Sequence, residues 1–184
     1  MKQSEFLFAG FGGQGVMFAG QLLAYAAMDA GLEVTWYPSY GPEMRGGTAH
    51  CYVVISEQPI GSPVVRNPKV AIVFNRPSYL KYEPEIAPGG LLVVNASLIE
   101  EQSLREDMQA VYVPATEVAD SLGDLRLANM VLLGAALAAH PAVTVDQLLA
   151  ALEAHIPKHR RNLLPLNRQA VEAGMRVALQ AEPA

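Results

Sequence analysis

The residue types that could do chemistry begin with a glycine-rich segment near the start of the chain. Gly10, Gly12 and Gly15 fit the spacing G-x-G-x-x-G, and Gly13 adds a fourth glycine inside it. An apolar run precedes this segment, and a long helical pattern follows it. A turn of this kind brings bare backbone N–H groups close to a ligand, usually a phosphate, at the N-terminus of a helix. The sequence therefore predicts a nucleotide-type binding turn.

A dinucleotide-binding turn requires a further residue that this sequence lacks. An acidic residue should end the second strand, where it bonds the ribose hydroxyls. The second predicted strand runs from Glu33 and ends at Tyr37-Pro38, with no acid at its end and no basic residue for NADP. The lysine of a P-loop is also missing, since neither Lys-Ser nor Lys-Thr follows the glycines. These absences disfavour NAD, NADP and a P-loop nucleotide.

A second segment of interest runs from Pro38 to Gly47. It is rich in turn residues, yet it carries the aromatic Tyr40, the acid Glu43 and the cation Arg45. A guanidinium forms forked hydrogen bonds to phosphate, so this arginine is a candidate ligand contact. The same loop could instead pack against another protein chain, with the arginine in an ion pair between subunits. Both interpretations stay open from the residues alone.

Alternating strands and helices must position these two segments. Periodicity, glycine and proline positions set the bounds of each predicted element. The predicted strands cover Glu5–Ala9, Glu33–Tyr37, Thr48–Ser56, Val70–Asn75, Leu91–Asn95 and Val111–Pro114. The predicted helices cover Gln14–Ala30, Pro77–Glu85, Thr116–Ser121, Leu127–Ala139, Thr144–His155 and Asn162–Glu182, with Thr116 and Thr144 as N-caps.

This order of elements predicts an α/β fold, with residues 1–184 forming one domain. We expect a Rossmann-like three-layer sandwich, a mostly parallel sheet with helices on both faces. The first 37 residues read as strand, helix and strand, which implies a parallel strand pair with a right-handed crossover. No crossover helix precedes Thr48–Ser56, so that strand should be antiparallel and the sheet mixed. The glycine turn would then lie beyond a strand's carboxyl end, where ligands bind in such sheets.

Composition narrows the class of partner. The formal net charge is −5 and no long basic run occurs, so nucleic-acid binding is disfavoured. No apolar stretch reaches the roughly 20 residues of a membrane helix, and the first residues do not resemble a signal peptide. Hydrophobic residues make up 51% and charged residues only 17% of the chain. Either partner subunits cover part of the surface or the core is large and compact.

Cysteine usage narrows the cofactors and the compartment. Cys51 is the single cysteine, so an intramolecular disulfide and a cysteine-ligated iron–sulfur cluster cannot be built from this chain. We expect it to pack as a small apolar residue in a cytoplasmic protein. His155 and His159 have the spacing of two metal ligands on a helix, but Pro157 interrupts that helix and no third ligand is near. A solvated pair is expected there, and no metal site.

Together the motifs resemble one protein family. Gly10-Phe-Gly-Gly-Gln-Gly15, followed by Ser39-Tyr-Gly-Pro-Glu-Met-Arg-Gly-Gly47, is similar to the gamma subunit of 2-oxoacid:ferredoxin oxidoreductases. Ala128-Asn129-Met130 with Leu133-Gly134-Ala135 resembles a further pattern of that family, and the resemblance spans roughly residues 5 to 175. Its members act on pyruvate, 2-oxoisovalerate, 2-oxoglutarate or indolepyruvate. The resemblance implies oxidative decarboxylation of a 2-oxoacid to acyl-CoA, with reduction of ferredoxin.

The resemblance also implies a division of labour among subunits. Alpha and beta subunits would hold thiamine diphosphate, and a beta or small delta subunit would hold the iron–sulfur clusters. The gamma subunit would carry neither, would reach ferredoxin only indirectly and would be inactive alone, with a homodimer of the isolated chain left open. Its associated ligand would be coenzyme A, and no residue of this chain is expected to be catalytic. A free-standing nucleotide-binding oxidoreductase and a purely structural assembly subunit remain the alternatives.

Coenzyme A carries a pyrophosphate and a 3′-phosphate, which backbone N–H groups and one or two cations could bind. Arg76, just after a predicted strand, is a second candidate cation. The predicted cofactor-binding residues are Gly12, Gly13, Gln14, Gly15, Tyr40, Glu43 and Arg45.

Overall fold

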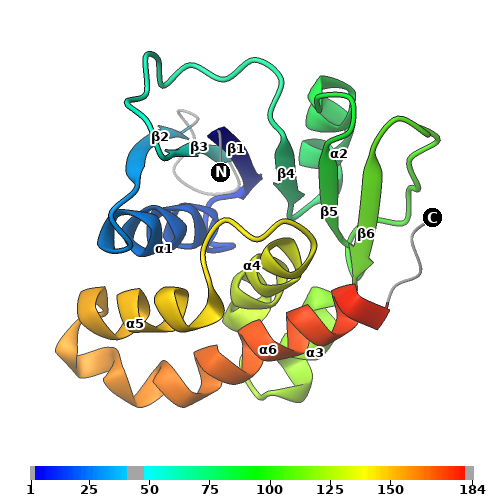
Figure 1. Ribbon diagram of the computed structural model, residues 1–184. Helices are drawn as coiled ribbons and strands as arrows, with labels where there is room; N and C mark the ends of the chain where they lie inside the picture. The colour runs from blue at the N-terminus through cyan, green and yellow to red at the C-terminus, as the bar shows by residue number, and fades with distance from the viewer. Residues whose placement is uncertain (1–2, 41–47, 181–184) are drawn as a thin grey trace.

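The computed structural model describes residues 3–40 and 48–180, whose strands form one six-stranded sheet in the order β2-β3-β1-β4-β5-β6 (Figure 1). Strands β1, β4, β5 and β6 are parallel to one another, whereas β3 runs antiparallel to both β1 and β2. The predicted mostly parallel, mixed α/β sheet is confirmed. The strand bounds are β1 (Gln3–Phe11), β2 (Glu33–Tyr40), β3 (Thr48–Ser56), β4 (Val70–Val73), β5 (Leu91–Asn95) and β6 (Gln109–Val113).

The predicted pairing of the first two strands was wrong. The first two strands, β1 and β2, were expected to be neighbours. Instead, β3 pairs with both of them and lies between them. The reason is that β3 folds back on β2 and offers its other edge to β1. β2 is also longer than predicted and takes in Pro38 and Tyr40, which were expected in a loop. Because β2 is an edge strand, it tolerates a proline there.

Helices cover both faces of the sheet, as predicted. α2 lies on one face together with Leu7 and Ala9 of β1, whereas α1, α4, α5 and α6 lie on the other with Phe6 and Phe8 (Figure 1). None of the helices within the described ranges has the length and apolarity to cross a membrane. The helix bounds are α1 (Val16–Asp29), α2 (Arg76–Tyr82), α3 (Ala115–Ser121), α4 (Ala128–Ala139), α5 (Val145–His155) and α6 (Leu164–Gln180). The described part of the chain also has three 3-10 segments next to these helices: η1 (Glu83–Glu85), η2 (Leu125–Leu127) and η3 (Lys158–Leu163).

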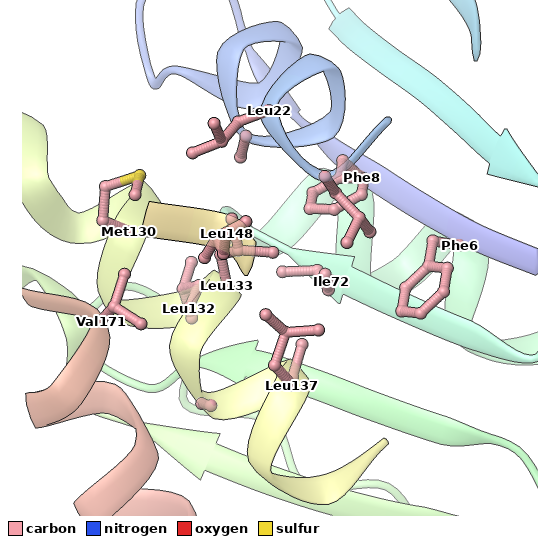
Figure 2. Packing of buried hydrophobic residues seen from close by; sticks show 14 of the residues in the cluster. Phe6, Phe8, Leu22, Ile72, Met130, Leu132, Leu133, Leu137, Leu148 and Val171 are labelled. Atoms are coloured by element: carbon pink, nitrogen blue, oxygen red, sulfur yellow. The ribbon is translucent and has the colours of Figure 1, made fainter. Parts of the chain in front are cut away.

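α4 is the central helix of the larger core. Every residue from Asn129 to Leu137 is buried, which confirms the helix predicted to be covered on most sides. Figure 2 shows side chains of α4 meeting those of β1, β4, α1, α5 and α6 in one cluster. α4 and α6 approach so closely at two glycines that a Cβ on Gly134 would lie 2.1 Å from the carbonyl oxygen of Val171. A Cβ on Gly174 would lie 1.9 Å from that of Val131.

Local capping signals gave one correct and one wrong prediction. Thr144 caps α5 through a capping box, in which its hydroxyl accepts from the N–H of Gln147 and the Gln147 side chain accepts from the N–H of Thr144. Thr116 does not cap α3, because that helix already begins at Ala115. Its hydroxyl instead accepts a hydrogen bond from Asn95 Nδ2 at 3.1 Å, which ties the end of β5 to α3.

Candidate functional site

The glycine turn lies where the sequence places it, between the carboxyl end of β1 and the start of α1. Gly13 and Gly15 have φ angles of 96° and 77°, in the left-handed region that favours glycine. Gly15 is the N-cap of α1 and supplies no side-chain hydrogen bond to it. The first-turn N–H groups of α1 are therefore left to face the space beyond the turn.

Only one of the four backbone N–H groups from Gly12 to Gly15 donates a hydrogen bond to a described residue. The N–H of Gln14 donates to the carbonyl oxygen of Phe11 at 3.2 Å, which closes the turn. The N–H groups of Gly12, Gly13 and Gly15 make no hydrogen bond to another described residue. A Cβ added at Gly12 or Gly13 would have no described atom within 4 Å. Three of the four predicted N–H donors are thus open to a ligand.

The side chain of Gln14 holds the turn in place. Its Oε1 accepts from the N–H of Phe11 at 2.7 Å and from Nδ2 of Asn75 at 2.9 Å. Asn75 follows β4 and is the N-cap of α2, where its Oδ1 accepts from the N–H of Ser78. α1 and α2 leave β1 and β4 toward opposite faces of the sheet, which makes this gap the switch point of the fold. The Gln14 side chain bridges that gap.

Asn129 at the start of α4 fixes the turn from the other side. Its Nδ2 donates to the carbonyl oxygen of Gly15 at 3.3 Å. A Cβ on Gly15 would lie only 2.3 Å from the same nitrogen, so both the φ angle and the contact require glycine. The Ala128-Asn129-Met130 pattern is part of the family resemblance, and no site role was predicted for it. The contact links positions 114 residues apart, and only the fold brings them together.

A cavity of about 220 Å³ opens beside the turn, between α1, α4 and the η3 segment. Its wall combines the turn glycines with an apolar surface that includes Phe18, which is 40% exposed. The sequence does not predict this cavity, because residues from four separate segments form it. The lining residues are Gly13, Gly15, Phe18, Asp124, Arg126, Leu127, Asn129, Ile156, Pro157, Arg160, Leu163 and Asn167.

Two arginines line this cavity, and they differ in whether an acidic residue pairs with them. Arg126 forms a forked ion pair with Asp124, with Nη2–Oδ2 and Nε–Oδ1 distances of 2.7 and 2.9 Å. These hydrogen bonds, together with the N–H of Arg126, hold the pKa of the Asp124 carboxyl below its usual value. Arg160 is exposed and has no ion pair with a described residue. The cavity arginine without an ion pair is therefore Arg160. In the sequence it belongs to a small basic cluster with Lys158 and Arg161, which was expected to be a solvated turn, with contact to a phosphate or an acidic partner as the alternative.

The remaining predicted binding residues belong to the end of β2 and the segment after it. Glu43 and Arg45 lie outside the described residues, as does the side chain of Tyr40 at the end of β2. Their contact with a ligand stays a prediction. Arg76 forms an exposed ion pair with Glu101, which occupies its guanidinium.

His155 and Cys51 both pack against other residues of the fold. His155 Nε2 lies 3.0 Å from Asp29 Oδ2, and its ring stacks on Tyr25 with centroids 4.0 Å apart, so it packs between helices and is not simply solvated. No group of three or more metal-ligating residues occurs within the described ranges. Cys51 is fully buried, and burial raises the pKa of its thiol to about 12. The prediction that it packs as a small apolar residue is confirmed.

Comparisons with known proteins agree on one family. The family model described as pyruvate ferredoxin/flavodoxin oxidoreductase matches residues 5–177. The ketoisovalerate oxidoreductase subunit VorA of Methanothermobacter marburgensis is 44% identical over 130 residues, which cover 71% of this chain and 27% of VorA. The chain thus spans about a quarter of the length of that relative.

Two solved structures are similar along nearly all of this chain. The gamma subunit of a keto/oxoacid ferredoxin oxidoreductase from Geobacter sulfurreducens has a TM-score of 0.82 and 28% identity, over 97% of this chain and 99% of that one. The 2-oxoglutarate:ferredoxin oxidoreductase of Magnetococcus marinus, solved with 2-oxoglutarate, coenzyme A and succinyl-CoA bound, has a TM-score of 0.89 and 26% identity. The match covers 100% of this chain and 32% of that one. The chain therefore belongs to the pyruvate ferredoxin/flavodoxin oxidoreductase family.

Proposed function

We propose that this chain is the gamma subunit of a 2-oxoacid:ferredoxin oxidoreductase and that its glycine turn binds the phosphates of coenzyme A. The observation that carries the proposal is the set of open N–H groups of Gly12, Gly13 and Gly15 at the switch point. The end-to-end similarity to a solved gamma subunit supports the subunit role. The coenzyme A bound in the Magnetococcus marinus enzyme supports the choice of ligand.

The strand order argues against a dinucleotide at the same turn. In the dinucleotide fold, the acid that reads the ribose stands at the end of the strand next to β1. Here β3 occupies that place, antiparallel to β1, and β2 lies one strand further away. The end of β2 carries no acid either. Free N–H groups without a ribose acceptor suit a phosphate group better than a nicotinamide dinucleotide.

In the overall reaction, this chain and its partner subunits would have different roles. The reaction converts a 2-oxoacid and coenzyme A to acyl-CoA and CO₂, and the two electrons released reduce ferredoxin. Thiamine diphosphate, held by alpha and beta subunits, would supply the decarboxylation chemistry, and iron–sulfur clusters in a beta or delta subunit would carry the electrons. The N–H groups of this chain orient the phosphates, while Gln14 keeps the turn rigid and Arg160 adds a positive charge. We place the complex in the cytoplasm, where the single cysteine stays a thiol.

A substitution at Gly12 tests the proposal in the assembled complex. Gly12→Val puts a branched side chain into the open space beside the turn, without a described atom in its way. We expect the KM for coenzyme A to rise at least tenfold, with the KM for the 2-oxoacid unchanged. Gly61→Val is the matched control, because Gly61 also has open space around it and lies in the distant segment between β3 and β4. An unchanged coenzyme A dependence in Gly12→Val would overturn the proposal and favour a purely structural subunit.

A further inference from the structure

Leu104 is an almost fully exposed leucine on the loop between β5 and β6. Its exposed fraction is 95%, the highest of any large apolar side chain in the described ranges. Leu80 of α2 is a second exposed leucine, at 51%, on the same side of the sheet. Single exposed apolar side chains are normal on a protein surface, so exposure alone assigns no role. What distinguishes Leu104 is the way in which its neighbours are held.

The residues on both sides of Leu104 are fixed to the fold by hydrogen bonds. The N–H of Ser103 donates to the Tyr112 hydroxyl of β6 at 2.7 Å, and the Ser103 hydroxyl donates to the Glu83 carboxylate. Arg105 Nη1 donates to the carbonyl oxygen of Glu83 at 2.9 Å. The backbone at Leu104 is therefore held in one position. A partner that binds there does not have to order a loop, which is a condition for tight binding by a small contact.

The same loop runs alongside Leu80. Arg76, Leu80 and Glu83 are three or four residues apart and therefore lie on one face of the helical segment formed by α2 and η1. Arg76 pairs with Glu101, and Glu83 accepts from Ser103, so the loop contacts this face before and after Leu80. The two exposed leucines thus stand on adjoining segments of one surface.

Negative charge borders these leucines. Residues 100–107 include four acids and one arginine. Glu101 and Asp107 each pair with an arginine. Glu100 and Glu106 are exposed and form no ion pair with a described residue. A protein that binds here must therefore present positive charge around an apolar contact. A second copy of this chain does not fit, because a two-fold contact would place the same acids opposite each other.

We propose that Leu104 and Leu80 form a docking surface for another subunit of the complex, one that offers an apolar pocket bordered by lysine or arginine side chains. The inference rests on the proposed function, which makes this chain one subunit among several. An apolar centre with a polar border is the usual arrangement of a protein–protein interface. The cavity beside the glycine turn lies on the α1 side of the sheet, so a subunit bound at Leu104 leaves it open.

Binding of the full chain to the purified alpha and beta subunits tests this, with Leu104→Asp compared with the wild type by biolayer interferometry. Because Leu104 is exposed, the variant should fold normally, which an unchanged urea midpoint verifies. Leu179→Asp is the matched control, since Leu179 is 72% exposed and lies on α6, which covers the other face of the sheet. A double variant, Glu100→Gln with Glu106→Gln, tests the charged border.

We expect the dissociation constant to rise about tenfold or more for Leu104→Asp, because an apolar contact is lost and a charge is brought into the interface. Leu179→Asp should bind like the wild type. The double glutamine variant should associate more slowly than the wild type, and its association rate should depend less on salt.

Wild-type affinity in Leu104→Asp, or an equal loss in Leu179→Asp, overturns the inference while the proposed function stands. A faster or unchanged association of the double glutamine variant overturns the basic border of the partner. A dimer of the isolated chain that Leu104→Asp separates, seen by analytical ultracentrifugation, overturns the inference in favour of a second copy. If the wild-type chain does not bind the alpha and beta subunits at all, the proposed function fails and the inference fails with it.

Discussion

Gln14 Oε1 accepts a hydrogen bond from Asn75 Nδ2 at 2.9 Å, across the gap between the ends of β1 and β4. The same oxygen also accepts from the N–H of Phe11. This one atom therefore joins the glycine turn to Asn75, the N-cap residue of α2. The glycine turn and the α2 helix on the opposite face of the sheet from α1 are thereby held in one arrangement.

Replacing Gln14 by leucine should cost both stability and ligand binding. Gln14→Leu leaves the N–H of Phe11 and the Nδ2 of Asn75 without their acceptor, which we expect to lower the free energy of unfolding by about 1–3 kcal/mol. The KM for coenzyme A should rise because the turn is no longer held. Urea denaturation and steady-state kinetics measure the two effects. Gln21→Leu, on the half-buried face of α1, serves as the control, and equal behaviour of the two variants would contradict the bridging role.

The contact between α4 and α6 should tolerate no side chain at its glycines. In Gly174→Ala the new methyl group would meet the carbonyl oxygen of Val131, so the helices must separate or bend. We expect a loss of about 1–3 kcal/mol in the free energy of unfolding, seen as a lower midpoint in urea. Gly61→Ala, which has open space around it, should leave the midpoint unchanged. Equal midpoints for the two variants would show that α6 does not pack as described.

Stability should fall when two half-buried histidines, His140 and His50, acquire a proton. Partial burial, with the charge of Lys69 adding to it, holds the pKa of His140 below its usual value of 6.5, while its Nε2 lies 2.9 Å from Ser4 Oγ. The pKa of His50 is lowered in the same way, by burial and then by Lys81. A lowered histidine pKa means that the folded state disfavours the proton, so the free energy of unfolding decreases as the pH falls below about 6.5.

His140→Gln isolates the contribution of one histidine. The difference in the free energy of unfolding between pH 7.5 and pH 5 should be smaller in the variant than in the wild type, because one group no longer takes up a proton on unfolding. Adding His50→Gln should reduce the difference further. An identical pH dependence in wild type and variants would contradict the assignment.

The single thiol should be unreactive in the folded protein. Burial raises the pKa of Cys51 to about 12, so almost no thiolate is present at pH 8, and the side chain is inaccessible. Labelling with a thiol reagent should proceed only at the rate at which the protein opens, and rapidly in denaturant. Fast stoichiometric labelling under native conditions would show that the strand around Cys51 is not packed as described.

Local patterns predicted the elements that depend on nearby residues. The glycine turn, the Thr144 cap and the buried α4 helix follow from spacing over a few positions, and the structure has all three. The place of β3 did not follow, because strand neighbours are set by pairing between distant segments. Its bounds and its antiparallel direction were predicted correctly, whereas the predicted pairing of β1 with β2 was wrong.

In the candidate site too, local patterns predicted some residues, whereas contacts between distant segments determine the others. The turn glycines were found from their spacing, but Asn129, Arg126 and Asn167 became site residues only because η2, α4 and α6 fold against the turn. In the sequence, Asn129 and Asn167 belong to predicted helices and Arg126 directly precedes one, so none of them indicates a site by its local pattern. Gln14 was predicted for its backbone N–H, and its structural importance lies in a side-chain contact with a residue 61 positions away.

The insertion of β3 between β1 and β2 has a consequence for how the chain folds during synthesis. All strand pairings of β2 and β3 are made within residues 3–56, so half of the sheet can form while the remainder is still being translated. One of its two open edges is then that side of β1 on which β4 later pairs, and the other is the outer side of β2. The residues that pair there, Phe6 to Ala9, are apolar. An unpaired apolar strand edge attracts other chains. The growing polypeptide is therefore most exposed to aggregation between the emergence of Ser56 and the docking of Val70–Val73.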